Sequence, residues 1–129
     1  MVKYKPFSKI VGTGSALPGI PISNDDLALM LKKNGIETSD SWIKERSGIS
    51  QRYFASETDT TCSLGLQASL RAMKDAGVTP NQIDLVIVAT TTPDCIFPSV
   101  ACQIQGKLGI DQGAAFDVQA VCSGFVYAL

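Results

Sequence analysis

The spacing of hydrophobic residues divides the chain into stretches of helical period and short, unbroken apolar runs. Five helices are expected, bounded by Ser or Thr caps at their starts and by glycines after most of their ends. They run from the Ser23 cap to Lys33, from a Thr38 or Ser39 cap to Gly48, and over Thr60–Ala76, Val100–Leu108 and Phe125–Leu129.

The remaining apolar runs and extended stretches predict strands at Ser8–Thr13, Ile49–Phe54, Leu85–Ala89 and Ala115–Val118. The run Leu85–Ala89 consists mainly of branched apolar residues, which is typical of a central strand buried on both faces of a sheet. Gly12 and Gly14 follow the first apolar positions, but they lack the third glycine of a dinucleotide-binding loop. We interpret these glycines as turn residues. Strands that alternate with helices indicate an α/β fold.

Composition narrows the function classes. The chain has 129 residues, 45% of them hydrophobic, and a net charge of −1. This hydrophobic content is enough for a domain core. The small net charge gives no electrostatic indication of binding to nucleic acid or anionic membranes. No apolar run approaches the ~20 residues of a membrane span, and no apolar segment follows the first lysines as in a secretory signal. We therefore expect a cytoplasmic protein.

The chain contains four cysteines and no histidine. The cysteines, which lack the C-x-x-C spacing of metal sites, are interpreted as reduced thiols, and no metal site is expected. Cys62 is predicted to be a core residue within its helix, and Cys95 and Cys102 are expected to pack as small hydrophobic residues.

Cys122 is the exception among the cysteines, because it follows a strand and opens a helix. Unpaired backbone N–H groups and the helix dipole at that position favour a thiolate. Ser123 and Gly124 leave room for an acyl group, and neighbouring N–H groups are suited to hold an oxyanion. The pattern is compatible with a covalent acyl-carrying nucleophile, or with an ordinary buried cysteine.

Trp42 and Arg46 are four residues apart on a short helix, so they share one face. An indole beside a guanidinium suits an adenine ring and a phosphate. A half-buried Trp with an Arg that reaches towards water gives the same pattern, and the residues alone favour this structural alternative.

With these motifs the chain resembles the β-ketoacyl-acyl-carrier-protein synthase III family, thiolase-like condensing enzymes that initiate bacterial type II fatty-acid synthesis. The matching stretches, in the family's order and spacing, are GTGSALP, TSDSWIKERSGI, LVIVATTTPD, FPSVACQIQGKLGI and AFDVQAVCSGFVYAL. Family members are longer and are built from two related halves. The resemblance implies a layered α-β-α-β-α fold in which residues 1–129 form an N-terminal half-domain. This half-domain is expected to be a mixed β-sheet covered by helices, and to be cut within the helix after Cys122.

The resemblance also implies an activity. Cys122 is acylated by acetyl-CoA or another short acyl-CoA, and decarboxylative Claisen condensation with malonyl-acyl-carrier-protein then gives 3-oxoacyl-acyl-carrier-protein. Trp42 and Arg46 match residues that hold the adenine and phosphate end of coenzyme A, with Thr38 close by. Coenzyme A enters as a substrate thioester, and no further cofactor is implied. Phe97 stands at a loop tip, where a Phe normally packs into its own core, but the resemblance implies a homodimer in which it closes the partner's acyl pocket.

Two alternatives remain. Other thiolase-fold synthases, such as hydroxymethylglutaryl-CoA synthases, chalcone-type synthases and related acyltransferases, share this layout. The chain is also interpretable as a catalytically incomplete piece, because family members draw a His and an Asn from their second half. We expect the 129-residue chain alone to be inactive and to expose apolar surface.

Overall fold

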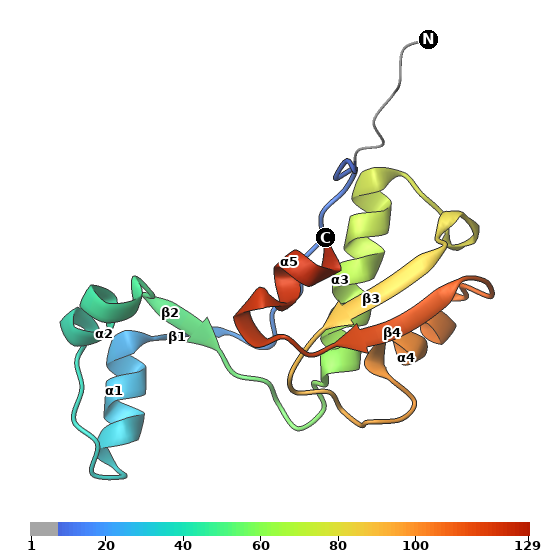
Figure 1. Ribbon diagram of the computed structural model, residues 1–129. Helices are drawn as coiled ribbons and strands as arrows, with labels where there is room; N and C mark the ends of the chain where they lie inside the picture. Colours follow the sequence, from blue (N-terminus) through green and yellow to red (C-terminus); the bar gives the residue numbers. More distant parts are fainter. Residues whose placement is uncertain (1–7) are drawn as a thin grey trace. The chain divides into compact units, whose positions relative to one another are not determined.

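The computed structural model describes residues 8–129. They form two compact units (Figure 1). One unit is Leu17–Asp59, and the other joins the segment that ends at Ala16 with Thr60–Leu129. No helix of the described residues is long and apolar enough to cross a membrane.

The unit Leu17–Asp59 pairs two short antiparallel strands with two helices. Strand β1 is Pro21–Ser23 and strand β2 is Gln51–Tyr53, within the stretch predicted to be extended. Helix α1 covers Asn24–Lys32, and helix α2 covers Asp40–Ser47.

Capping residues fix the bounds of these two helices, as the sequence predicts. The Ser23 hydroxyl accepts a hydrogen bond from the Asp26 N–H, and the Ser39 hydroxyl accepts one from the Trp42 N–H. Gly48 ends α2 in the left-handed conformation, with φ of 70°. Of the two residues proposed as the cap of α2, Ser39 therefore fills that role rather than Thr38.

The larger unit is built on two parallel strands, β3 (Leu85–Ala89) and β4 (Ala114–Val118), which pair from Leu85 opposite Ala114 to Ala89 opposite Val118. Helices α4 and α5 both pack against these strands, and α4 also packs against α3 (Figure 1). The helical elements of this unit are α3 (Thr61–Ala76), η1 (Pro80–Gln82), α4 (Val100–Leu108), η2 (Val121–Ser123) and α5 (Gly124–Ala128).

The core of this unit lies between α3, α4 and the strands. Cys62, Val100 and Ile104 are buried there, with Val86, Val88 and Leu108 packed against them. The prediction that Cys62 is a core residue is confirmed, since only 1% of it is exposed. Cys95 and Cys102 are instead exposed, so the prediction that they pack as small apolar residues is wrong. Both thiols lie at hydrogen-bond distance from backbone carbonyl oxygens.

The predicted first strand, Ser8–Thr13, is not a strand in the structure. This segment runs along α3: the Thr13 N–H donates to Asp75 at 2.9 Å, and Arg71 donates to the Ser15 carbonyl. Its β-branched residues favour a strand, but a strand forms only where a neighbouring strand is available to pair. Here side chains of α3 form hydrogen bonds with backbone groups at and just after the end of this segment instead.

Gly12 and Gly14 explain how closely this segment approaches α3. A Cβ at Gly12 would lie 2.6 Å from the Ala72 carbonyl oxygen, and one at Gly14 would collide with the backbone at Ala68 and Ala72. Neither glycine has a positive φ, so their interpretation as turn residues is wrong. They are required because only glycine permits this contact.

Strand β3 also differs from the prediction of a strand buried on both faces. Within the described residues it pairs with β4 alone, and 47% of Leu85 is exposed. Its three middle residues, Val86–Val88, are partly buried. The described neighbours of β3 therefore leave part of its apolar surface uncovered.

Candidate functional site

Cys122 lies where the sequence places it, on the turn between a strand and a helix. Strand β4 ends at Val118, and Cys122 is the middle residue of η2, directly before α5. The thiol is free and exposed. The alternative of an ordinary buried cysteine therefore does not apply to Cys122, although it applies to Cys62.

The backbone of this turn is strained at the residue before the thiol. Val121 has a φ of +46°, the one positive φ of a non-glycine residue in 8–129. A β-branched residue in this region is a genuine outlier, and such strain concentrates at functional turns. It points the chain sharply from β4 into α5.

Two hydrogen bonds close the turn: the Ser123 N–H donates to the Ala120 carbonyl at 2.9 Å, and the Gly124 N–H donates to the Val121 carbonyl. The Cys122 N–H has no hydrogen-bond partner among the described residues. Gly124 is buried, and a Cβ there would lie 3.1 Å from the Ala89 Cβ, so α5 begins in close contact with β3. The turn thus holds Cys122 firmly while leaving its own N–H available.

Phe97 belongs to the same unit and follows the neighbouring strand. The loop that carries it leaves β3 after Ala89, while Cys122 follows β4. The two strands are parallel, so both segments start from the same, carboxyl edge of the pair, where α/β folds bind ligands. Phe97 is 90% exposed, so it does not pack into the core of its own unit.

Trp42 and Arg46 form a stacked pair on α2. The Arg46 Cζ lies 4.3 Å from the centre of the Trp42 ring, as their spacing predicts. The guanidinium also contacts the Trp42 carbonyl at 3.5 Å and the Glu45 carboxylate at 3.6 Å. Trp42 remains 52% exposed, which leaves indole surface for a second planar group.

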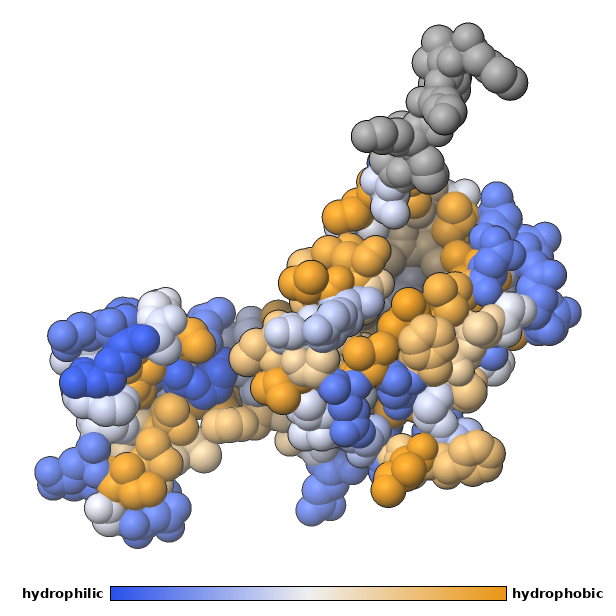
Figure 2. All heavy atoms as spheres, in the orientation of Figure 1, coloured by the Kyte–Doolittle hydropathy of each residue, from blue (hydrophilic) through white to orange (hydrophobic). Residues whose placement is uncertain are grey.

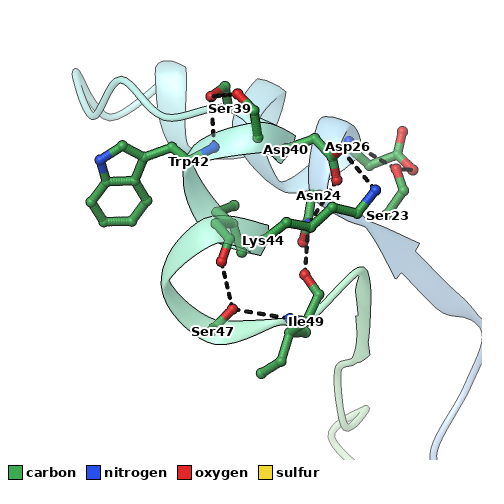
Figure 3. A network of polar contacts seen from close by, with 11 residues as sticks. Ser23, Asn24, Asp26, Ser39, Asp40, Trp42, Lys44, Ser47 and Ile49 are labelled. Carbon is green, nitrogen blue, oxygen red and sulfur yellow. Dashed lines mark hydrogen bonds and ion pairs between the residues drawn. The ribbon is translucent and has the colours of Figure 1, made fainter.

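A buried amide supports this helix from α1. Asn24 is fully buried, and its Nδ2 donates to Asp40 at 2.9 Å and to the Ile49 carbonyl at 2.8 Å. Hydrogen bonds from Lys44 and then from Asn24 hold the pKa of Asp40 below its usual value, against a smaller opposing effect of burial. In Figure 3 the Trp42 ring points away from this network, which fixes the backbone of α2 and leaves the ring free.

Thr38 directly precedes Ser39, the cap of the helix that carries the stacked pair. Its hydroxyl is buried and finds no hydrogen-bond partner among the described residues. It lines an open hollow of about 480 Å³ together with Lys32 and Leu29 of α1. Trp42 and Arg46 do not line this hollow, although Ser39, the cap of α2, does.

Sequence reasoning did not single out Lys32, which lines the hollow beside Thr38 together with the acidic residues Asp25 and Glu37. Lys32 lies in the last turn of α1, where a positive charge interacts favourably with the helix dipole. The helical pattern does not distinguish this role from ligand binding.

Comparison with known proteins places these features in a family context. No family model matches the chain. A solved 3-oxoacyl-[acyl-carrier-protein] synthase III from Aquifex aeolicus VF5 is 42% identical, with a TM-score of 0.82 over 93% of this chain and 37% of that one. The priming β-ketosynthase of the R1128 polyketide pathway is 36% identical, with a TM-score of 0.85 over 99% of this chain and 37% of that one.

A synthase III from Thermus thermophilus is 34% identical, with a TM-score of 0.80 over 94% of this chain and 36% of that one. The chain therefore spans little more than a third of the length of these proteins. It has the thiolase-like α/β fold and is a partial 3-oxoacyl-[acyl-carrier-protein] synthase III-like chain.

Proposed function

We propose that this chain carries the acyl-accepting cysteine of a condensing enzyme. The observation that supports this most directly is the exposed thiol of Cys122 on a strained turn between β4 and α5. The chain is similar to synthase III proteins and to a polyketide priming β-ketosynthase. The substrates we propose are acetyl-CoA, or another short acyl-CoA, and malonyl-acyl-carrier-protein.

In the first half-reaction the Cys122 thiolate adds to the thioester carbonyl carbon of the acyl-CoA. The tetrahedral intermediate collapses, the bond from carbon to the coenzyme A sulfur breaks, and the free thiol of coenzyme A leaves after taking up a proton. The Cys122 N–H, which has no partner among the described residues, is a suitable donor to the oxyanion of that intermediate.

In the second half-reaction malonyl-acyl-carrier-protein loses carbon dioxide, and the resulting carbanion attacks the acyl-cysteine. The carbon–sulfur bond breaks, the Cys122 thiolate is regenerated, and 3-oxoacyl-acyl-carrier-protein is formed. The sequence has no histidine, so in this proposal the groups that promote decarboxylation come from outside these 129 residues.

We assign the adenine and phosphate end of coenzyme A to Trp42 and Arg46. The indole has exposed surface on which a base can stack, and the guanidinium offers donors to phosphate oxygens. The partnerless Thr38 hydroxyl and the Lys32 ammonium are further candidates for polar groups of this substrate. We further assign to Phe97 the role of limiting the acyl group in the partner subunit of a homodimer, and its 90% exposed side chain is available for such a contact.

The experiment that tests this function follows both substrates. Malonyl-acyl-carrier-protein with acetyl-CoA should give 3-oxoacyl-acyl-carrier-protein in the full-length enzyme that contains this chain, and Cys122→Ala should abolish the product. Formation of the same product by Cys122→Ala would overturn the proposal.

A second candidate uses the same cysteine with a different acceptor. Besides the synthase III proteins, the similar structures include a tetronic acid condensing enzyme, 34% identical to this chain. Replacing malonyl-acyl-carrier-protein with malonyl-CoA or another nucleophilic acceptor distinguishes the two candidates, because the acylation of Cys122 is common to both.

A further inference from the structure

The loop between β3 and α4 presents two large apolar side chains at its tip. Ile96 and Phe97 are 93% and 90% exposed. A flexible loop would let such side chains collapse onto nearby apolar surface, since burying each of them is worth about 1.5–3 kcal/mol. The hydrogen bonds on either side of the tip explain why these two side chains stay exposed.

The first tether joins the loop to the start of α3. The Asp94 carboxylate accepts hydrogen bonds from the N–H groups of Thr61 and Cys62, both at 2.7 Å. The Thr61 hydroxyl donates to the Thr92 carbonyl at 2.8 Å. Asp94 therefore satisfies two N–H groups that the first turn of a helix leaves unpaired, from a position more than thirty residues away.

The second tether joins the other side of the tip to α4. The Gln103 amide Nε2 lies 3.1 Å from the Pro98 carbonyl oxygen and 3.2 Å from the Cys95 sulfur. Helix α4 is itself held to β4, because the Asp117 carboxylate accepts the N–H groups of Val100 and Ala101 at 2.9 and 2.8 Å. The tip thus stands between two fixed points on the core of the unit.

The charge on Asp94 strengthens the first tether. Burial alone raises the pKa of Asp94, but the backbone N–H groups of Cys62 and Thr61, with the nearby threonine hydroxyls, outweigh it and lower the pKa below its usual value. The carboxylate is therefore ionised at neutral pH and makes charge-assisted hydrogen bonds at the positive end of α3.

We propose that Asp94 and Gln103 are positioning residues that hold the tip formed by Ile96 and Phe97 in one conformation and thereby restrict Cys122 of the partner subunit to short acyl groups. This inference rests on the proposed function, in which Phe97 limits the acyl pocket. A rigid Phe excludes longer chains, whereas a tip that moves aside admits them. One methylene group discriminates by about 10–200-fold in a well-formed pocket.

The competing explanation is that Asp94 only stabilises α3. Ser63 provides the matched control, because its hydroxyl completes the capping box of α3 with Thr60 and makes no hydrogen bond to the loop. Asp94→Asn removes the charge and one of the two acceptor oxygens of the tether while preserving the size of the side chain. Ser63→Ala weakens the same helix end without changing the tether.

The test compares acylation of Cys122 by acetyl-CoA and hexanoyl-CoA in the full-length protein, read by intact mass. Asp94→Asn and Gln103→Ala should raise the hexanoyl-to-acetyl ratio of acylation rates about tenfold or more. Ser63→Ala should leave this ratio unchanged, and Asp94→Glu should restore part of the selectivity. An equal change in Asp94→Asn and Ser63→Ala would overturn the inference.

Amide hydrogen exchange at Thr61 and Cys62, whose N–H groups donate to Asp94, separates this inference from the proposed function. Exchange should be faster in Asp94→Asn than in Ser63→Ala when the two variants are compared at equal global stability. Equal exchange would overturn the tether even if Cys122 is acylated. Failure of the unaltered protein to take up any acyl group would overturn the proposed function and the acyl-length role, while faster exchange would still support the tether itself.

Discussion

At the scale of single residues, the stacked pair on α2 gives the most accessible test of coenzyme A binding. Trp42 is the single tryptophan of the chain, so its fluorescence reports on this helix alone. Coenzyme A should quench the fluorescence as the adenine stacks. Arg46→Ala should weaken binding roughly tenfold, because a hydrogen bond to a charged group contributes about 1.5–3 kcal/mol.

Lys107→Ala is the control for this titration, since it removes one positive charge from α4, in the other unit. It should leave the dissociation constant of coenzyme A unchanged. Equal binding by Arg46→Ala and the unaltered protein would contradict the assignment of the phosphate end to Arg46.

Residue-level chemistry is predictable from sequence where it depends on neighbours in the chain. The turn position of Cys122 and the pairing of Trp42 with Arg46 follow from spacing alone. The tether at Asp94 does not, because its partners at Thr61 and Cys62 lie more than thirty residues away and leave no periodic signal. The strained φ of Val121 is equally hidden, since valine gives no indication of a left-handed turn.

At the scale of elements, the helix bounds follow from local capping. Ser39, Thr60 and Ser99 each accept a backbone N–H three residues ahead, and Gly48 and Gly77 end helices with a positive φ. The segment Ser8–Thr13 was mispredicted because its state depends on its contact with α3, which is a tertiary effect. The cap of a helix lies within a few residues, whereas a strand depends on its partner.

That contact predicts a large effect of adding one methyl group. Gly14→Ala should destabilise the chain by about 1–3 kcal/mol, the usual cost of overpacking, because its Cβ would collide with the α3 backbone. Gly106→Ala is the matched control, since it lies within α4 and a Cβ there meets nothing within 4 Å. It should stabilise by about 0.5–1 kcal/mol.

Urea denaturation of both variants measures these changes in the free energy of unfolding. A Gly14→Ala chain as stable as the unaltered chain would show that the segment before Ala16 does not pack on α3 as described.

At the scale of the whole molecule, three carboxyl groups make the free energy of unfolding depend on pH in the acid range. The pKa values of Asp40, Asp59 and Asp94 all lie below the ordinary 3.8. For Asp59, the backbone N–H of Ser56 is the largest cause, followed by the Ser56 hydroxyl. Each group is more acidic when folded, so its contribution is complete above pH 3.8 and is lost as the pH falls through the folded pKa.

The free energy of unfolding should therefore fall below about pH 4. Between pH 5 and pH 8 these three groups stay ionised in both states, so their contribution to the free energy of unfolding should not change with pH. Asp94→Asn should reduce the slope on the acid side, and urea midpoints measured across this range check it. An unchanged acid slope in Asp94→Asn would contradict the ionic hydrogen bonds assigned to Asp94.

The described residues also expose much apolar surface (Figure 2). In the larger unit, α5 contributes Phe125, Val126 and Tyr127, each at least 68% exposed. This exposure was expected of a partial chain, and it accords with a match to little more than a third of the length of similar proteins. The fold class was predictable because the alternation of strands and helices follows from local sequence patterns. Those local patterns do not show what covers the exposed apolar surfaces.

The central claim is that Cys122 is the acyl acceptor, and intact mass after incubation with acetyl-CoA tests it most directly. The unaltered full-length protein and Cys102→Ala, which lacks another exposed thiol, should each gain one acetyl group. Cys122→Ala should gain none. Acetyl uptake that persists in Cys122→Ala, or that disappears in Cys102→Ala, would contradict the assignment.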